Sequence, residues 1–300
     1  MRDFASCFGE NAVRLSDTSC SSRSNNSRMI SPSPNPSSTQ DSVTCFYRTV
    51  LSTQKQVLIT VSWCKNALSQ GLNITFGDDY SSSFRLNTNS RLFRKLKGSK
   101  SMEFPDSKVE VFWDLSTAQY QTGPEPMDGY YVLIMFDSEL GLILGDMVDE
   151  AMARKLKTGT RIAKFSLLSR QEMFSGNSTL HSTKVQFSEN GVAHDILIRC
   201  GGEEEGLEHP VLSVFVDKKT VSRVDRLQWN FRGNQTIFLD GLLVDFMWDV
   251  HDWIHHDSGG RGYAVFMFRT RGGMDSRILW MEEKKEQDKV EFSLMIYAYV

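Results

Sequence analysis

Apolar and polar residues alternate through most of the chain after position 43, and this alternation predicts β-strands. The segment 56–64 shows the pattern well, because its large apolar residues occupy every second position: Val57, Ile59, Val61 and Trp63. Successive side chains of a strand point to opposite faces of the sheet, so these residues share one buried face. The segments 109–115 and 242–248 repeat the same period. We therefore expect half-buried strands at all three places.

A second pattern, a continuous apolar run, occurs at Tyr130–Phe136 and again at Leu140–Leu144. A run without polar alternation is typical of a strand that is buried on both faces. The tripeptide Asp137-Ser138-Glu139 separates the two runs and predicts a tight connection between them. This region is expected to form the middle of a sheet.

Further strands are predicted between turn signals at 44–51, 71–76, 163–168, 179–187, 192–198, 211–216, 220–230, 235–239, 263–268 and 292–299. Strands do not alternate with helices. Only Val148–Lys157, with Asp146 as a candidate cap, favours a short helix, and a continued strand is the alternative there. Short strands at this spacing indicate an all-β domain, a mainly antiparallel β-sandwich or jelly-roll-like fold with at most one or two short helices. We expect one large β domain over residues 43–300.

Residues 1–42 form a Ser/Pro-rich segment that lacks the apolar content needed for a core, and it is predicted to be a disordered tail. Ser31 and Ser33 each precede a proline, so they are candidate sites for a proline-directed kinase. The alternative is a tolerated extension without a role.

The net charge and the cysteine content indicate which cellular compartment and which partners to expect. The net charge of -3 gives no reason to expect a polyanion partner for the whole molecule. Five scattered cysteines without a CxxC pair predict reduced thiols, and Cys45 and Cys64, inside apolar strands, are expected in the core. The first ten residues show no secretory signal, and no apolar run is long enough to span a bilayer. We expect an intracellular protein, cytoplasmic or nuclear, that is not secreted.

A basic patch follows the third predicted strand and is interleaved with apolar residues: Arg91, Arg94, Lys95, Lys97 and Lys100. Such a patch suits an acidic membrane surface, nucleic acid or an import receptor. A cationic edge strand that discourages edge-to-edge pairing explains it equally well.

Four stretches resemble a plant protein family known as domain of unknown function 868: VTCFYRTVLSTQKQVLITVSW, VFWDLSTAQYQTGPEPMDGYYVLIMFDSELGLILGDM, LQWNFRGNQTIFLDGLLVDFMWDVHDW and AVFMFRTR. The resemblance runs from about Val43 onward and implies a plant, intracellular, mostly β protein. It implies no reaction, cofactor or catalytic residue. In the basic patch, Phe93 stands where the family commonly has tryptophan.

Candidate chemistry is sparse. A metal-ligand mixture of histidine and aspartate occurs at His251, His255 and His256 beside Asp249, Asp252 and Asp257. An extended backbone would separate His256 from the other two, so a polar turn without metal is favoured. The neighbours His194 and Asp195 face opposite sides of a strand and make a poor acid–base pair. No nucleophile elbow, phosphate loop or nucleotide-binding fingerprint is present.

These observations favour a non-enzymatic protein-interaction module that needs no cofactor. Its expected surfaces are the basic patch and Trp253, which lies in a polar, histidine-rich segment where an exposed aromatic side chain can anchor a partner. The alternative is a carbohydrate- or lipid-binding β-sandwich, with Trp253 and Tyr263 near a groove and the basic patch meeting anionic groups. A third hypothesis is a metal-dependent enzyme that uses His251 and His255. Sequence alone leaves the partner, an unknown protein or an anionic surface or glycan, open.

Overall fold

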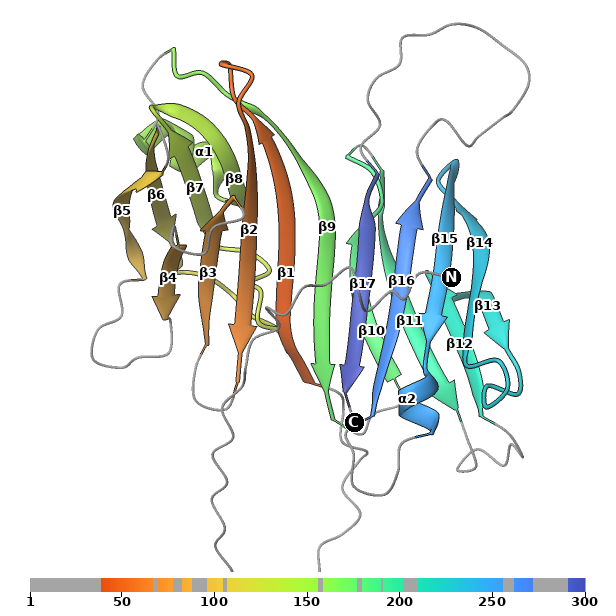
Figure 1. The fold of residues 1–300 in the computed structure, drawn as a ribbon. Coiled ribbons are helices and arrows are strands. Elements are labelled where there is room, and N and C mark those ends of the chain that lie inside the picture. The colour runs from red at the N-terminus through yellow and green to blue at the C-terminus, as the bar shows by residue number, and fades with distance from the viewer. Residues whose placement is uncertain are drawn as a thin grey trace, which may run out of the picture. The chain divides into compact units, whose positions relative to one another are not determined.

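The computed structural model describes residues 39–66, 70–77, 83–87, 96–104, 107–155, 159–176, 180–189, 191–201, 210–255, 262–271 and 291–299. Within these ranges the chain forms seventeen β-strands and two short helices (Figure 1). The all-β class predicted from the alternation is confirmed.

The largest sheet has nine strands in the order β14-β15-β16-β17-β9-β1-β2-β3-β4. Their bounds are β1 (Thr39–Val50), β2 (Gln56–Lys65), β3 (Gln70–Phe76), β4 (Ser83–Asn87), β9 (Lys164–Ser175), β14 (Arg232–Leu239), β15 (Leu242–Asp249), β16 (Tyr263–Thr270) and β17 (Ser293–Tyr299). Neighbours in this sheet are antiparallel except β17 and β9, which run parallel.

Two antiparallel sheets of four strands each complete the fold. One contains β5 (Lys97–Phe104), β6 (Ser107–Asp114), β7 (Tyr131–Phe136) and β8 (Glu139–Gly145); the other contains β10 (Leu180–Gln186), β11 (Ala193–Gly201), β12 (Val211–Val216) and β13 (Lys219–Val224). Within each small sheet the spatial order follows the chain order, so strands that are consecutive in the chain pair with each other.

Two hydrophobic cores show how the sheets are layered. The first core gathers inward side chains of β2, β3 and β4 with those of β6, β7 and β8. The second gathers side chains of β14 to β17 with those of β10, β11 and β12. The nine-stranded sheet therefore serves two sandwiches, one at each end, and the small sheets cover its two halves.

Strand β7 is buried on both faces, as its continuous apolar run predicts. Val132, Ile134 and Phe136 face the first core. Leu133 and its outward neighbours form a smaller cluster with Ala151 of α1 (Val148–Lys155). The helix predicted after position 147 is thus confirmed, and it covers the face of β7 that the sandwich leaves outside.

Strand β9 belongs to both sandwiches. It pairs antiparallel with β1 over its whole length and parallel with β17 from Ser169 to Ser175, so β1, β9 and β17 lie side by side in Figure 1. The register of this β1–β9 pairing shifts at two places, between Gln40 and Ser42 and between Phe46 and Tyr47, where Leu168 of β9 is the extra residue. Because β9 supplies hydrogen bonds to both partners, the nine strands form one continuous sheet.

A buried carboxylate lies at this junction. The side chain of Glu172 is fully buried, and its Oε1 accepts hydrogen bonds from Arg170 Nε at 2.6 Å and Thr183 Oγ1 at 2.7 Å. Its Oε2 accepts from Gln40 Nε2 at 2.8 Å. Arg170 also pairs with Glu125 at 2.7 Å. Burial opposes the charge of Arg170, but the two carboxylates raise its pKa above the usual range.

The strand limits differ from the predicted ones at several places. β1 begins at Thr39, so residues 39–42 of the predicted tail pair with β9. β13 ends at Val224 instead of continuing to Asn230, because the chain turns at Arg226, whose φ is 53°. Asp146 precedes the helix and accepts a hydrogen bond from the Tyr130 amide at 3.1 Å.

Replacing Trp113 with alanine should lower the free energy of unfolding by about 3–5 kcal/mol, because the side chain is only 4% exposed and lies in the first core. Denaturant titration followed by circular dichroism measures the change. Trp229 is the matched control, since its side chain is 78% exposed, and its replacement should cost less than about 0.5 kcal/mol. Equal midpoints for the Trp113 variant and the parent chain would contradict the core placement.

Candidate functional site

A groove of about 510 Å³ opens between β4 and β5, at the edge of the first sandwich. β4 is the last strand of the nine-stranded sheet and β5 the last strand of a small sheet, so among the described strands each has a partner on one side only. The outer backbone N–H and C=O groups of such edges are a template for pairing with another extended chain. The groove is thus an open seam between two sheets.

The floor of the groove is aromatic. Phe84 of β4 and Trp113 of β6 pack with their ring centroids 4.9 Å apart, and both are buried. Gly98 of β5 allows this packing, because a Cβ at that position would come within 2.8 Å of the Trp113 indole. The floor fixes the separation of the two edges and belongs to the core.

The walls of the groove are cationic. Arg85, Lys97 and Lys100 line it, and all three residues are exposed. Lys97 Nζ pairs with Asp114 at 2.5 Å, whereas within the described residues no carboxylate pairs with Arg85 or Lys100. Lys100 Nζ lies 5.9 Å from the centre of the Phe84 ring, a cation–π contact. The groove therefore carries positive charge that the surrounding described residues leave unbalanced.

Asp114 explains why Lys97 differs from the other two cations. Burial alone would raise the pKa of this carboxyl group, but hydrogen bonds from Lys97 and Ser116 outweigh burial and lower it. The pair is a fixed structural contact at the end of β5. Arg85 and Lys100 are the residues that remain to meet a ligand.

The basic patch predicted from the sequence is only partly described. Lys97 and Lys100 lie on β5, while Arg91, Arg94 and Lys95 fall outside the described residues, as do Ser31 and Ser33. β5 is an edge strand, as the alternative explanation for the patch required. Arg85 was missed, because a single arginine in a short strand gives no signal until the fold brings β4 beside β5.

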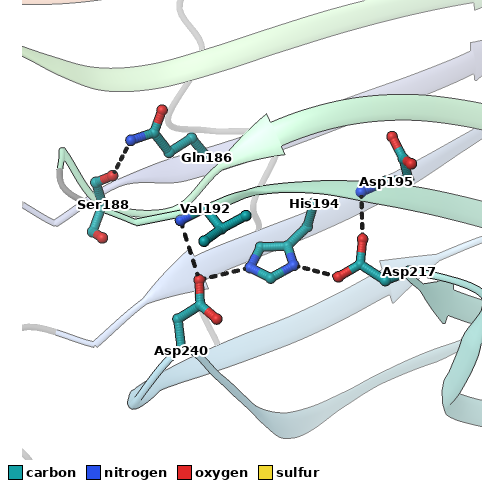
Figure 2. Close-up of polar contacts among 7 residues, drawn as sticks. All are labelled: Gln186, Ser188, Val192, His194, Asp195, Asp217 and Asp240. Carbon is teal, nitrogen blue, oxygen red and sulfur yellow. Dashed lines mark hydrogen bonds and ion pairs between the residues drawn. The ribbon is translucent and has the colours of Figure 1, made fainter.

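The second sandwich holds a different polar cluster around His194 of β11 (Figure 2). Nδ1 of the ring lies 2.6 Å from Asp217 Oδ2, and Nε2 lies 2.8 Å from Asp240 Oδ2. Asp217 belongs to the turn between β12 and β13, and Asp240 to the turn between β14 and β15. Figure 2 shows the ring between the two carboxylates, which come from hairpins of opposite sheets.

This geometry assigns a proton to each ring nitrogen. Ionised carboxylates only accept hydrogen bonds, so an imidazole that contacts one at each nitrogen donates twice and is an imidazolium. Hydrogen bonds from the ring to Asp217 and Asp240 raise the pKa of His194 despite its burial. Such a ring has no lone pair for general-base catalysis, and it acts as a latch between two hairpins. Asp195 points away from it, as the strand alternation predicts, and donates only its backbone N–H to Asp217.

The histidine-rich segment is helical and not extended. α2 (His251–Ile254) brings the His251 and His255 rings to 5.1 Å between centroids, since residues four apart share one face of a helix. His251 Nδ1 contacts Asp252 Oδ1 at 2.9 Å. His256 and Asp257 fall outside the described residues. Among the residues that are described, no group of three or more histidine, cysteine or acidic side chains is arranged to hold a metal ion.

Trp253 lies in α2 and is half-buried against the second core, so part of its surface is accessible. Trp229, which the sequence did not single out, is far more exposed. Cys45 is buried, and burial raises the pKa of its thiol to about 11. The prediction that Cys64 is a core residue is wrong: it follows the buried Trp63 in β2, so the alternation turns it outward, where it is exposed.

These features define an all-β protein with two sandwiches on one shared sheet and an open cationic seam. No helix in the described ranges is long and apolar enough to cross a membrane. Residues 38–300 match the family model described as plant protein of unknown function (DUF868), and the chain belongs to that family, as its sequence motifs predicted. Searches of curated proteins and of solved structures found no match.

Replacing His194 with glutamine should lower the thermal midpoint at about pH 6 and change it less at about pH 8.5. The folded state raises the pKa of His194 above its ordinary value of 6.5, so the folded chain binds this proton more tightly than the unfolded chain. The stabilisation is fully present below the ordinary value and is lost as the pH rises through the raised one. Thermal unfolding over a pH series measures the effect.

His181 provides the control with the opposite sign. Burial lowers its pKa from 6.5 to about 4, and within the described residues neither ring nitrogen has a hydrogen-bond partner. The unfolded chain therefore binds this proton first, and stability falls as the pH drops from 6.5 towards 4. In a His181→Leu variant the loss of stability between pH 6.5 and pH 4 should be smaller than in the parent, while the effect of His194 should be unchanged. A His194→Gln effect that is equal at both pH values would argue against the imidazolium latch.

Proposed function

We propose that this protein is a non-enzymatic, intracellular protein-interaction module that binds an acidic, extended segment of a partner in the seam between β4 and β5. The observation that carries the proposal is the groove between two strands that are outermost in their sheets within the described part of the chain, with Arg85 and Lys100 above an aromatic floor. An extended peptide can add to a sheet edge through backbone hydrogen bonds, while side chains at alternate positions select the partner. Acidic side chains at those positions would meet the two cations.

Two features favour a peptide over nucleic acid. The chain as a whole carries a net charge of -3, which disfavours a long polyanion outside the seam. The seam lies between two strand edges, and a single extended peptide presents the backbone donors and acceptors that such edges lack. Phosphate backbones accept hydrogen bonds but offer no amide donors.

The probe is a fluorescein-labelled peptide of alternating glutamate and valine, measured by fluorescence polarisation with the intact chain. The variant Arg85→Glu/Lys100→Glu should weaken binding by about tenfold or more, and added salt should weaken the parent's binding, because exposed charges are screened. Replacing glutamate in the peptide by glutamine should also weaken binding.

The matched control is Lys164→Glu/Lys184→Glu, which makes the same charge change at exposed residues of β9 and β10. It should leave binding within about twofold of the parent. If both double variants weaken binding equally, the effect comes from the net charge of the chain and not from the seam. If the Arg85→Glu/Lys100→Glu variant binds like the parent, the seam is not the binding site.

The tail is the regulated part of the proposed module. Ser31 and Ser33 precede prolines, and a phosphate on either would add up to about two negative charges near Arg23 and Arg28 in the sequence. Phosphopeptide mapping of protein from plant tissue should find both serines modified. Repeated coverage of both serines without phosphate would contradict this part of the proposal.

A further inference from the structure

A second cavity, of about 670 Å³, lies at the turn end of the first sandwich, where the β1–β2 turn and the β7–β8 turn meet residues 159–161. Its volume is in the range of small-molecule sites. Buried Leu51 and Phe136 contribute an apolar floor. Five further lining residues carry hydroxyl groups: Ser52, Thr53, Ser107, Ser138 and Thr160.

Ser52 joins a buried carboxylate to an exposed guanidinium in this wall. Its N–H donates to Glu139 Oε1 at 2.8 Å and its hydroxyl to Glu139 Oε2 at 2.7 Å. Arg161 Nη1 donates to the same hydroxyl oxygen at 3.3 Å. Glu139 is 8% exposed, and each of its oxygens can accept one more hydrogen bond.

The guanidinium group of Arg161 has N–H donors available for an anion. Within the described residues its guanidinium makes only the contact with Ser52, so most of its N–H donors are uncommitted. Lys55 Nζ is a second cation in the same cavity and donates to Ser107 Oγ at 3.3 Å. Asp137, the other acidic residue of the lining, directs Oδ1 to the Lys108 amide at 2.8 Å. Carboxylates and phosphates are the groups that a planar guanidinium fork binds in a bidentate way.

We propose that this cavity binds a small polyhydroxylated anion, a sugar phosphate or sugar acid. The anionic group would lie between Arg161 and Lys55, and the hydroxyl groups of the ligand would exchange hydrogen bonds with the serine and threonine hydroxyls and donate to Glu139. A wall of groups that both donate and accept suits a polyol better than an apolar ligand, since each ligand hydroxyl needs both kinds of partner. The site is separate from the β4–β5 seam and does not depend on its function.

Isothermal titration of the intact chain with four probes tests the assignment: glucose 6-phosphate, gluconate, glucose and inorganic phosphate. At least one of the first two should bind with a dissociation constant of about a millimolar or tighter, and at least about tenfold more tightly than glucose or phosphate. Comparing glucose 6-phosphate with gluconate tells whether the anionic group is a phosphate or a carboxylate.

The variants Arg161→Gln and Lys55→Gln should each weaken binding of the better probe by about tenfold or more. Arg223→Gln is the matched control, because Arg223 is an exposed arginine of β13 in the other sandwich, and it should bind like the parent. Absence of binding by both sugar anions, equal affinity for inorganic phosphate, or binding that Arg161→Gln leaves unchanged would each overturn the proposal. Thermal midpoints of the variants, measured alongside, show that they fold.

Discussion

The burial of the Glu172 carboxylate in β9 is the constraint on which the arrangement of the two sandwiches depends. A carboxylate taken out of water is strongly unfavourable unless hydrogen bonds and an opposite charge replace its hydration. Here Arg170 of β9, Gln40 of β1 and Thr183 of β10 supply them. Arg170 lies on the shared strand β9 itself, Gln40 on the neighbouring strand β1, and Thr183 on β10 in the small sheet of the second sandwich. Displacing β1 or β10 would remove one of the neutral hydrogen bonds that replace the hydration of the buried carboxylate, so Glu172 favours the observed meeting of these strands.

A shared central strand has consequences for the surfaces. Because β9 pairs on both sides, the nine-stranded sheet is continuous through its middle, and its outermost strands among the described residues are β4 and β14. The β4 edge opens beside β5 and forms the cationic seam. In the second sandwich, by contrast, the His194 latch bonds the β12–β13 turn to the β14–β15 turn. The first sandwich therefore presents a groove with unbalanced positive charge, whereas in the second an ionic contact joins two hairpin turns.

The hydroxyl-lined cavity and the seam use different means of recognition. In the seam, the aromatic rings form a buried floor and the accessible groups are strand backbone and two cations, which suits an extended chain. In the cavity, Arg161, Lys55 and Glu139 converge with several hydroxyl groups from four separate segments, which suits a compact polar molecule. Both sites are made by loops or edges that the rigid cores hold in place, a common arrangement for binding residues.

Much of the fold followed from local pattern. The strands around Trp63, Trp113 and Phe136 were predictable because period-two alternation and continuous apolar runs report burial of one face or both. The candidate sites were less predictable. Lys97 and Lys100 stood out as part of a charge cluster, but Arg85 is distant from them in sequence and joins them only when two sheet edges meet. Asp217 and Asp240 each lie between two predicted strands, yet nothing in the sequence connects them to His194.

The sequence by itself therefore determined the all-β class, most strand positions and the burial of both faces of β7, because these depend on short-range patterns. It also determined membership of the plant family, because the family motifs are long stretches of consecutive residues. Only the tertiary structure decided that β9 is shared, that β17 joins it in parallel, that Lys97 is neutralised by Asp114 while Arg85 and Lys100 are not, and that His194 is held between two aspartates. These are long-range contacts. Alternation tells which face a side chain occupies, but strand order and the meeting of distant turns depend on how the sheets pack.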